Sequence, residues 1–178
     1  MKFYVDPTNI SAKNKKKLQE DSRILSSMRK LANSNHCVLQ SVLSTGLCII
    51  RQGDHSPTGR CIKLGIMDQS GIILFAPQFT NIFQDKDALI VSREGKWGVI
   101  QQGVQVTPFH YDAIDGIYSC GRLKVQYHGL WGYIDKAGVE VIPCQFQQGE
   151  CFNKWRAIVN KAGQTITINT KGETIQTE

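Results

Sequence analysis

The pattern of hydrophobic and polar positions changes near residue 35. Before that point, apolar residues recur at helical spacings of mostly three, four and seven between Leu18 and Ala32. After it, short runs of Val, Ile, Thr and aromatic residues alternate with polar residues at period two, as in β-strands. All 16 glycines lie at or after Gly46, which indicates a helical start followed by a turn-rich remainder.

Residues 1–35 are predicted to form a basic amphipathic helix that caps the rest of the chain. Residues 10–33 lack Gly and Pro and are rich in good helix formers, and Asn33 to Asn35 provide a stop. Residues 1–34 hold eight Lys or Arg and three acidic residues, whereas the remainder holds 13 and 12. The net charge of +6 is therefore concentrated in this segment, and the nearly neutral remainder argues against nucleic acid as the main partner.

A segment of about 34 residues is repeated along the rest of the chain. Two stretches align directly, "KWGVIQQGVQVTPFHYDAI" from Lys96 and "LWGYIDKAGVEVIPCQFQQ" from Leu130. Both contain a Trp-Gly pair, a glycine turn and a proline that is followed three residues later by an aromatic residue. Weaker copies flank them, with Leu64 and Thr165 where the Trp would stand. We divide the β-region, residues 36–178, into units at about 36–63 (partial), 64–95, 96–129, 130–163 and 164–178 (partial).

Each unit is predicted to contain three short antiparallel strands. The first is the Trp-Gly strand, the second ends at the proline, and the third follows a longer loop and forms a hairpin with the next Trp-Gly strand. The glycine beside each Trp is expected to leave room for an aromatic ring from a neighbouring strand. The fold class is therefore all-β, an elongated or curved array of three-stranded repeats, and closure into a barrel or propeller-like ring stays open. The segment from Gly53 to Cys61 is expected to form a lengthened hairpin and is the first candidate for a specialised loop.

The W-G-x-I…G…V-x-V-x-P unit resembles the WG repeat, also called the KWG repeat, of many bacterial proteins. The resemblance covers roughly residues 60–178 and is strongest in the units that contain Trp97 and Trp131. It implies tandem antiparallel β-units that act as a non-catalytic binding scaffold. The family motif contains no catalytic residue, cofactor or metal ligand, so the resemblance implies none in this chain.

Residues that carry chemistry in other proteins are present, but their spacing matches no catalytic or metal-binding motif. None of the six cysteines forms a C-x-x-C pair, which argues against zinc ribbons and thioredoxin-like sites, and we expect reduced, buried thiols. A hydrolase would need His110, Cys120 and His128 to meet, or two of the loop carboxylates to pair. Those carboxylates are Asp85, Asp87, Asp112, Asp115 and Glu150. We expect them to be solvated turn residues, and we expect no cofactor or metal.

The aromatic residues offer the best candidates for a binding face, because Trp and Tyr often dominate protein interfaces. Trp155 stands out because the residue 34 positions earlier is Gly121, so repeat packing does not require it. The candidate partner-binding residues are Trp155, Lys154, Arg156, Tyr118 and Tyr127.

The sequence thus favours a non-catalytic scaffold that binds another protein, with alternatives from two other classes. One alternative is a nucleic-acid or anionic-surface binder that uses the Lys13–Lys17 run of the helix. The other is the hydrolase described above. No apolar segment is long enough to span a bilayer and the start shows no signal peptide, so we expect a cytoplasmic location without membrane insertion.

Overall fold

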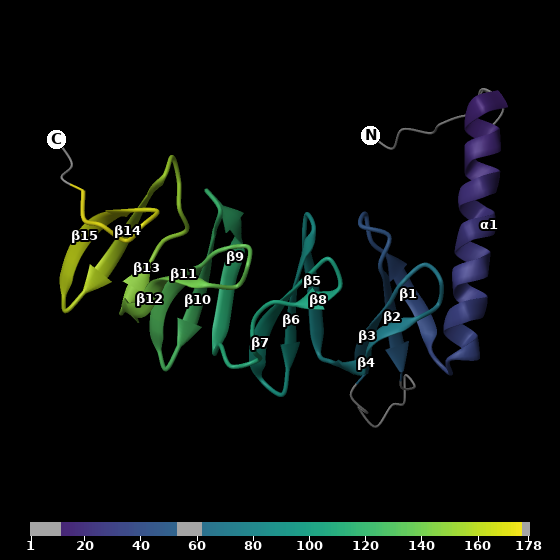
Figure 1. Ribbon diagram of the computed structural model, residues 1–178, viewed down its shortest axis with the longest axis horizontal. Coiled ribbons are helices and arrows are strands. Elements are labelled where there is room, and N and C mark those ends of the chain that lie inside the picture. The colour runs from purple at the N-terminus through teal and green to yellow at the C-terminus, as the bar shows by residue number, and fades with distance from the viewer. Residues whose placement is uncertain (1–11, 53–61, 176–178) are drawn as a thin grey trace, which may run out of the picture.

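The computed structural model describes residues 12–52 and 62–175, which form one helix and four antiparallel sheets arranged in a row (Figure 1). The side chains of residues 12–16 and 18 are not among those described. Helix α1 (Ala12–Ser34) stands at one end of the row, and the sheet nearest the C-terminus stands at the other. The predicted fold class, tandem antiparallel β-units behind an N-terminal helix, is confirmed, and the row is open rather than closed into a ring.

Each sheet is a meander whose strands follow one another in chain order. Sheet 1 contains β1 (Val38–Val42), β2 (Cys48–Gln52), β3 (Lys63–Met67) and β4 (Ile73–Phe79). Sheet 2 contains β5 (Asn81–Asp85), β6 (Ala88–Arg93), β7 (Lys96–Gln101) and β8 (Val104–Gln105). Sheet 3 contains β9 (Ala113–Ser119), β10 (Arg122–Tyr127), β11 (Leu130–Ile134) and β12 (Glu140–Phe146). Sheet 4 contains β13 (Gln148–Gly149), β14 (Arg156–Lys161) and β15 (Gln164–Asn169).

The core consists of four apolar clusters, one in each gap of the row. They lie between α1 and sheet 1, between sheets 1 and 2, between sheets 2 and 3, and between sheets 3 and 4. In β6, Leu89 and Val91 pack toward sheet 1, whereas Ile90 packs toward sheet 3. Because neighbouring layers cover both faces of sheet 2, five successive residues of β6 are buried and its sequence is a continuous apolar run rather than an alternation.

The sequence repeats and the sheets are out of phase. The Trp-Gly strand β11 pairs with β10 before it as well as with β12 after it. We expected a longer loop after each aromatic residue, but this segment contains a further strand, which is β5, β9 or β13. A turn or loop then places this strand beside the strand that follows it in the chain, which is β6, β10 or β14. Sheets 1 to 3 therefore have four strands instead of the predicted three, and sheets 2 to 4 begin after the aromatic residue instead of at the Trp-Gly pair.

The glycine of a Trp-Gly pair makes room for backbone, which corrects the expectation of an aromatic ring. Edge strand β12 bulges around Pro143 between its pairings with Trp131 and Tyr133. A Cβ on Gly132 would lie only 2.6 Å from the carbonyl oxygen of Ile142. The proline therefore sits inside the strand, at a bulge, rather than at the strand end as predicted, and an edge bulge tolerates its missing N–H.

The same arrangement recurs in sheet 1, whereas sheet 2 varies it. A Cβ on Gly65 would lie 2.7 Å from the carbonyl oxygen of Phe75 and 2.9 Å from the nitrogen of Pro77. At Gly98 the nearest atoms belong to the ring of Phe109, at 2.9 Å, so the ring expectation holds in that unit. In sheets 1 and 3, the glycine thus packs against the backbone around the proline on the neighbouring strand.

Trp97 and Trp131 occupy equivalent places in sheets 2 and 3. Each pairs with the strand before it and, on its other side, with the aromatic residue that follows the proline, Tyr111 or Phe146. Both indole rings are half-buried and pack on the cluster toward the following sheet. The repeat inferred from the sequence is therefore a repeat in three dimensions.

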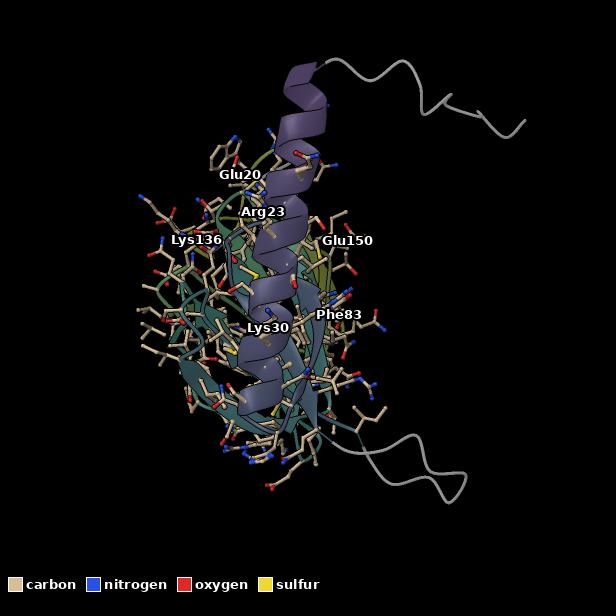
Figure 2. All side chains as sticks on the ribbon, turned by 90° about the vertical axis from the view of Figure 1, so that its right-hand side faces the viewer. Glu20, Arg23, Lys30, Phe83, Lys136 and Glu150 are labelled. Carbon is tan, nitrogen blue, oxygen red and sulfur yellow. The ribbon has the colours of Figure 1, made fainter. Side chains whose placement is uncertain are left out.

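Helix α1 takes the place of a preceding sheet at the start of the row. The turn glycine of sheet 2, Gly103, lies against Leu74 of sheet 1, whereas Gly71 of sheet 1 lies against Leu31 of the helix. Met28 of α1 is buried in the same gap. Viewed from this end, α1 crosses in front of the sheets, with Phe83 and Glu150 on one side of the row and Lys136 on the other (Figure 2).

The lengthened hairpin expected from Gly53 to Cys61 lies outside the described residues. The strands that flank it, β2 and β3, pair antiparallel. In the described part of the chain, no helix combines the length and the apolar character needed to cross a membrane.

Candidate partner-binding site

The outer face of sheet 4, at the end of the row, is mainly polar. Ile168 of β15 packs on sheet 3, so Thr165 and Thr167 point to the opposite, outer face. The residues at these two places in sheet 3 are Trp131 and Tyr133, which both pack toward sheet 4. Hydroxyl side chains thus stand where sheets 1 to 3 have apolar side chains that pack on the following sheet, and this face is suited to contact with water.

Two large apolar side chains interrupt the polar surroundings. Ile158 in β14 is 45% exposed, and Trp155 in the turn before β14 is 66% exposed. Lys154 and Arg156, on either side of Trp155, are exposed as well. We call Lys154, Trp155, Arg156 and Ile158 the terminal site.

Trp155 lies in a two-residue hairpin turn with Lys154. The backbone N–H of Asn153 donates to the Arg156 carbonyl at 2.8 Å, and the N–H of Arg156 donates back at 3.0 Å. The central residues, Lys154 and Trp155, have φ of 46° and 67°, the positive values of a type I′ turn. The N–H of Trp155 also donates to the sulfur of Cys120 at 3.4 Å, which ties the turn to sheet 3.

A tryptophan at this turn position is unusual for this protein. In five other two-residue turns both central φ angles are positive and the second residue is glycine. These turns are Glu94-Gly95, Gln102-Gly103, Cys120-Gly121, His128-Gly129 and Ala162-Gly163. A bulky residue in the left-handed region costs about 1–2 kcal/mol relative to glycine. Trp155 is thus a strained residue whose ring is mostly in water.

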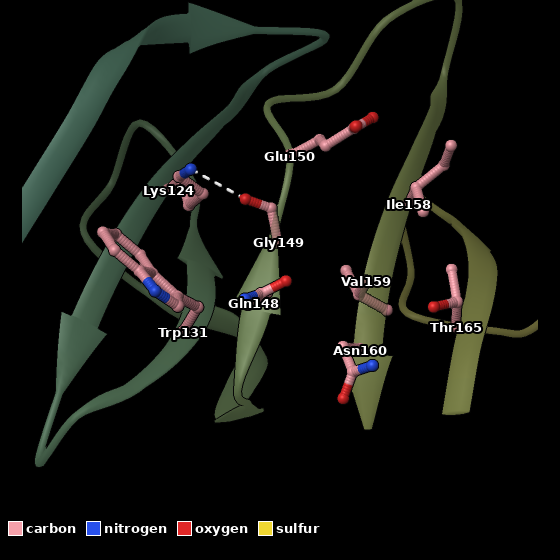
Figure 3. A pocket seen from close by; sticks show the side chains of 9 residues that line it. All are labelled: Lys124, Trp131, Gln148, Gly149, Glu150, Ile158, Val159, Asn160 and Thr165. Atoms are coloured by element: carbon pink, nitrogen blue, oxygen red, sulfur yellow. Dashed lines mark hydrogen bonds between the residues drawn. The ribbon is translucent and has the colours of Figure 1, made fainter. Parts of the chain in front are cut away.

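Two shallow hollows flank Ile158 and share Glu150 as a lining residue. One, of about 350 Å³, lies beside β13 and is lined by Lys124 and Trp131 of sheet 3 together with residues of sheet 4 (Figure 3). The other, of about 270 Å³, is lined by Arg156, Ala157 and Ile158 among others. A partner side chain placed at either hollow would contact both a charged and an apolar group.

Lys124 fixes β13 and the start of the loop that leads to Trp155. Its side chain is almost fully buried, and its ammonium group donates to the Gly149 carbonyl at 2.8 Å, as drawn in Figure 3. The same group lies 2.6 Å from a carboxylate oxygen of Asp115 and 4.6 Å from the centre of the Trp131 ring. With these three contacts, Lys124 serves to position backbone and is engaged by the protein itself.

The cysteine in this region is a protonated thiol at neutral pH. The pKa of Cys151 is raised, mainly because neighbouring protein atoms withdraw its thiol from part of the surrounding water although the residue as a whole is exposed; Lys124 opposes the shift and Asp115 adds to it. Burial likewise raises the pKa of Cys144 to about 11. Cys37 and Cys48 are buried as expected, whereas Cys151 is exposed, contrary to the expectation of buried thiols. A thiol with a raised pKa is a poor nucleophile.

Tyr118 does not belong to a binding surface, and its place among the predicted site residues is wrong. Its side chain is 7% exposed and packs in the cluster between sheets 2 and 3, and its hydroxyl donates to the Asp135 carbonyl at 3.1 Å. Tyr127 is exposed, but it lies at the C-terminal end of β10. The Trp155 turn is bonded to Cys120, which lies before the opposite end of that strand. The structure therefore separates Tyr127 from the terminal site.

The residues of the hydrolase alternative do not form a Cys–His pair. The rings of His110 and His128 both pack on Tyr127, which ends β10, whereas Cys120 precedes β10 and accepts the N–H of Trp155. Each loop aspartate has its own donors: the Tyr118 N–H for Asp85, Gln101 and Lys136 for Asp87, Lys96 for Asp112 and Lys124 for Asp115. In the part of the chain that the structure describes, no three His, Cys, Asp or Glu side chains form a group suited to a metal ion.

The alternative based on the Lys13–Lys17 run falls mostly outside the described side chains. Only Lys17 of this run is described, and it is exposed. The nucleic-acid alternative thus stays a prediction from the sequence.

Residues 131–164 match the family model described as the WG containing repeat. The chain contains a WG repeat. The matched segment runs from the middle of sheet 3 into sheet 4, so the WG repeat includes the gap between two sheets rather than one sheet. The terminal site lies entirely within this WG repeat.

One similar solved structure is that of the computationally designed Ika8 protein. It is 14% identical in sequence, with a TM-score of 0.40, and the match covers 74% of this chain and 46% of that chain. No curated protein matches the sequence.

Sequence reasoning missed Ile158 and Glu150 as members of this region. Ile158 resembles any other strand isoleucine until the pairing shows that it points away from sheet 3. The signal that could have revealed it is the change at the neighbouring strand, where Thr165 and Thr167 replace the Trp and Tyr of the previous copy.

Proposed function

We propose that the chain is a non-catalytic WG-repeat scaffold that binds another protein through the terminal site. The observation that carries this proposal is the strained, solvent-exposed Trp155 at a turn position that glycine occupies in five comparable turns. Backbone strain at an exposed residue is maintained where the side chain serves a purpose other than folding.

The surroundings of Trp155 support a protein as the partner. An exposed Trp beside an Arg is a typical pair of binding hot spots, because both residues are enriched among those that dominate binding energy and both bury large areas. Ile158 and Arg156 lie two residues apart in β14 and both line the hollow of about 270 Å³, which adds apolar contact surface beside Arg156. The remaining outer face is polar, so the terminal site is a local apolar patch with a polar rim.

Site-specific photo-crosslinking tests this proposal. A photoreactive amino acid is introduced at Ile158 of the full chain, in the cells that express it, and crosslinked products are identified by mass spectrometry. We expect one protein to be crosslinked in stoichiometric yield and the crosslink to be lost when Trp155→Gly is added.

A matched control uses the same photoreactive residue at Val104. This residue is apolar and 64% exposed, close to the value for Trp155, but it lies in sheet 2. The proposal is contradicted if the partner crosslinks equally from position 104, or if Trp155→Gly leaves the crosslink from position 158 intact.

A further inference from the structure

We infer that the terminal site binds an acidic peptide segment of its partner, with an apolar side chain next to one or more carboxylates. This inference rests on the proposed function and adds the chemistry of the partner. The charges of the terminal site, the hollow beside Arg156 and the position of Glu150 support it.

The terminal site carries an excess of available positive charge. Lys154 and Arg156 are exposed, and neither forms an ion pair with any residue that the structure describes. The ion pairs among the described residues are formed by Lys96, Lys124 and Lys136 instead. Two cations on either side of a strained Trp155 leave this turn complementary to negative charge.

The hollow that Arg156 borders combines charged and apolar surface. Ala157 and Ile158 contribute apolar surface to it, and its volume is about 270 Å³. This is enough space for one apolar side chain. Arg156 and Ile158 are two residues apart in β14, so their side chains project from the same face of the strand. A carboxylate of the partner that is bound by the guanidinium would therefore lie next to an apolar side chain of the partner that packs on Ile158.

The position of Glu150 makes this site better suited to a peptide than to a nucleic acid. Glu150 lines the same hollow, and its N–H donates to the Ile158 carbonyl at 2.9 Å, which places it beside Ile158 on the neighbouring strand. A continuous phosphate backbone would meet this carboxylate. A peptide can place its acid at Arg156 and a neutral residue at Glu150, so the mixed charges favour a peptide.

Selection from a displayed library of random peptides tests the inference on the full chain. Peptides are selected on the wild-type protein and counter-selected on Trp155→Gly, and the enriched peptides are synthesised for affinity measurement. We expect Asp or Glu next to Leu, Ile or Phe in the enriched sequences, with affinity that falls as salt is raised.

A charge swap then isolates the role of Arg156. Arg156→Glu should weaken the enriched peptides by about ten-fold or more, and peptides with Lys in place of the acid should regain affinity for this variant. The matched control is Lys161→Glu, which reverses a charge at the far end of β14 where Lys161 is bound to Gln145. This control should leave the affinity within about two-fold of the wild-type value.

The outcomes separate the inference from the proposed function. Enriched peptides that are neutral or basic, or an affinity unchanged by Arg156→Glu, overturn the inference while binding through Trp155 stands. Binding of mixed-sequence single-stranded RNA that is lost in Arg156→Glu overturns it as well. Failure to enrich any peptide that depends on Trp155 contradicts the proposed function itself.

Discussion

At the scale of single residues, the fold depends on where backbone comes close to backbone. The Trp-Gly pair is conspicuous in the sequence because of its tryptophan, yet in sheets 1 and 3 the glycine has the more demanding role. Gly65 and Gly132 each face the bulged backbone of the proline strand at less than 3 Å from the place of a Cβ. The sequence shows that the glycine and the proline recur together in each copy, but the contact between them follows only from the strand register, since the sequence predicts an aromatic ring beside the glycine.

Gly132→Ala is predicted to destabilise the protein strongly. The new methyl group would lie 2.6 Å from the Ile142 carbonyl oxygen and 2.7 Å from the Cys144 nitrogen, which are backbone atoms that cannot move alone. We expect a loss of about 2–4 kcal/mol in the free energy of unfolding, measured by urea denaturation. Gly98→Ala is the comparison, because its nearest neighbour is the Phe109 ring, which can rotate away. A smaller loss for Gly132→Ala than for Gly98→Ala would refute this account of the motif.

At the scale of elements, helix and strands are interchangeable partners for a sheet face. The sequence predicts α1 from its helical spacing and predicts its end within a residue or two, because both signals are local. It does not predict β5, β9 and β13, because β13 is only two residues long and these edge strands become regular through pairing with the following strand. The register of these pairings also decides that Tyr118 is buried, which its aromatic character alone does not reveal.

The helix is predicted to contribute to stability through one apolar face only. Met28 is buried against sheet 1, whereas Lys30 is exposed on the opposite side of α1 (Figure 2). Met28→Ala should lower the free energy of unfolding by about 2 kcal/mol or more, while Lys30→Ala should change it by less than about 0.5 kcal/mol. Chemical denaturation monitored by circular dichroism gives both values. Equal effects of the two substitutions would show that α1 is not packed on the sheet.

At the scale of the whole molecule, the stacked sheets bury three tyrosines in two neighbouring gaps, Tyr111 and Tyr118 between sheets 2 and 3 and Tyr133 between sheets 3 and 4. Burial is the main cause that raises the pKa of Tyr111 to about 12, and it also raises the pKa values of Tyr118 and Tyr133. Nearby acidic groups add to each shift. The stacking of layers thus makes stability sensitive to alkaline pH.

Stability should be independent of tyrosine ionisation below about pH 10 and should fall above it. In the unfolded chain these tyrosines ionise near the ordinary value of 10.0, whereas the folded protein keeps them protonated, so rising pH favours unfolding from pH 10 to 12. Thermal melting across this range tests the expectation. Tyr118→Phe should lessen the slope above pH 10, and a slope unchanged in this variant would contradict the assignment.

The tryptophans that hold the row of sheets together differ from the one that is available to a partner. Repeat packing explains both Trp97 and Trp131, which pack into the gap toward the next sheet. It does not explain Trp155, whose side chain belongs to none of the four apolar clusters and is 66% exposed, so it gains little from folding. The sequence singled out Trp155 by comparison with Gly121, but the strain that gives this comparison its meaning depends on the backbone angles.

The most direct measurement is the free energy of unfolding of Trp155→Gly against the wild-type protein, made together with crosslinking from Ile158. Glycine relieves the left-handed strain at φ 67° and forfeits little buried area, so we predict a gain of about 0.5–1 kcal/mol together with loss of the partner. A drop of about 1 kcal/mol or more, with the partner still bound, would show instead that Trp155 serves the fold and would contradict the account.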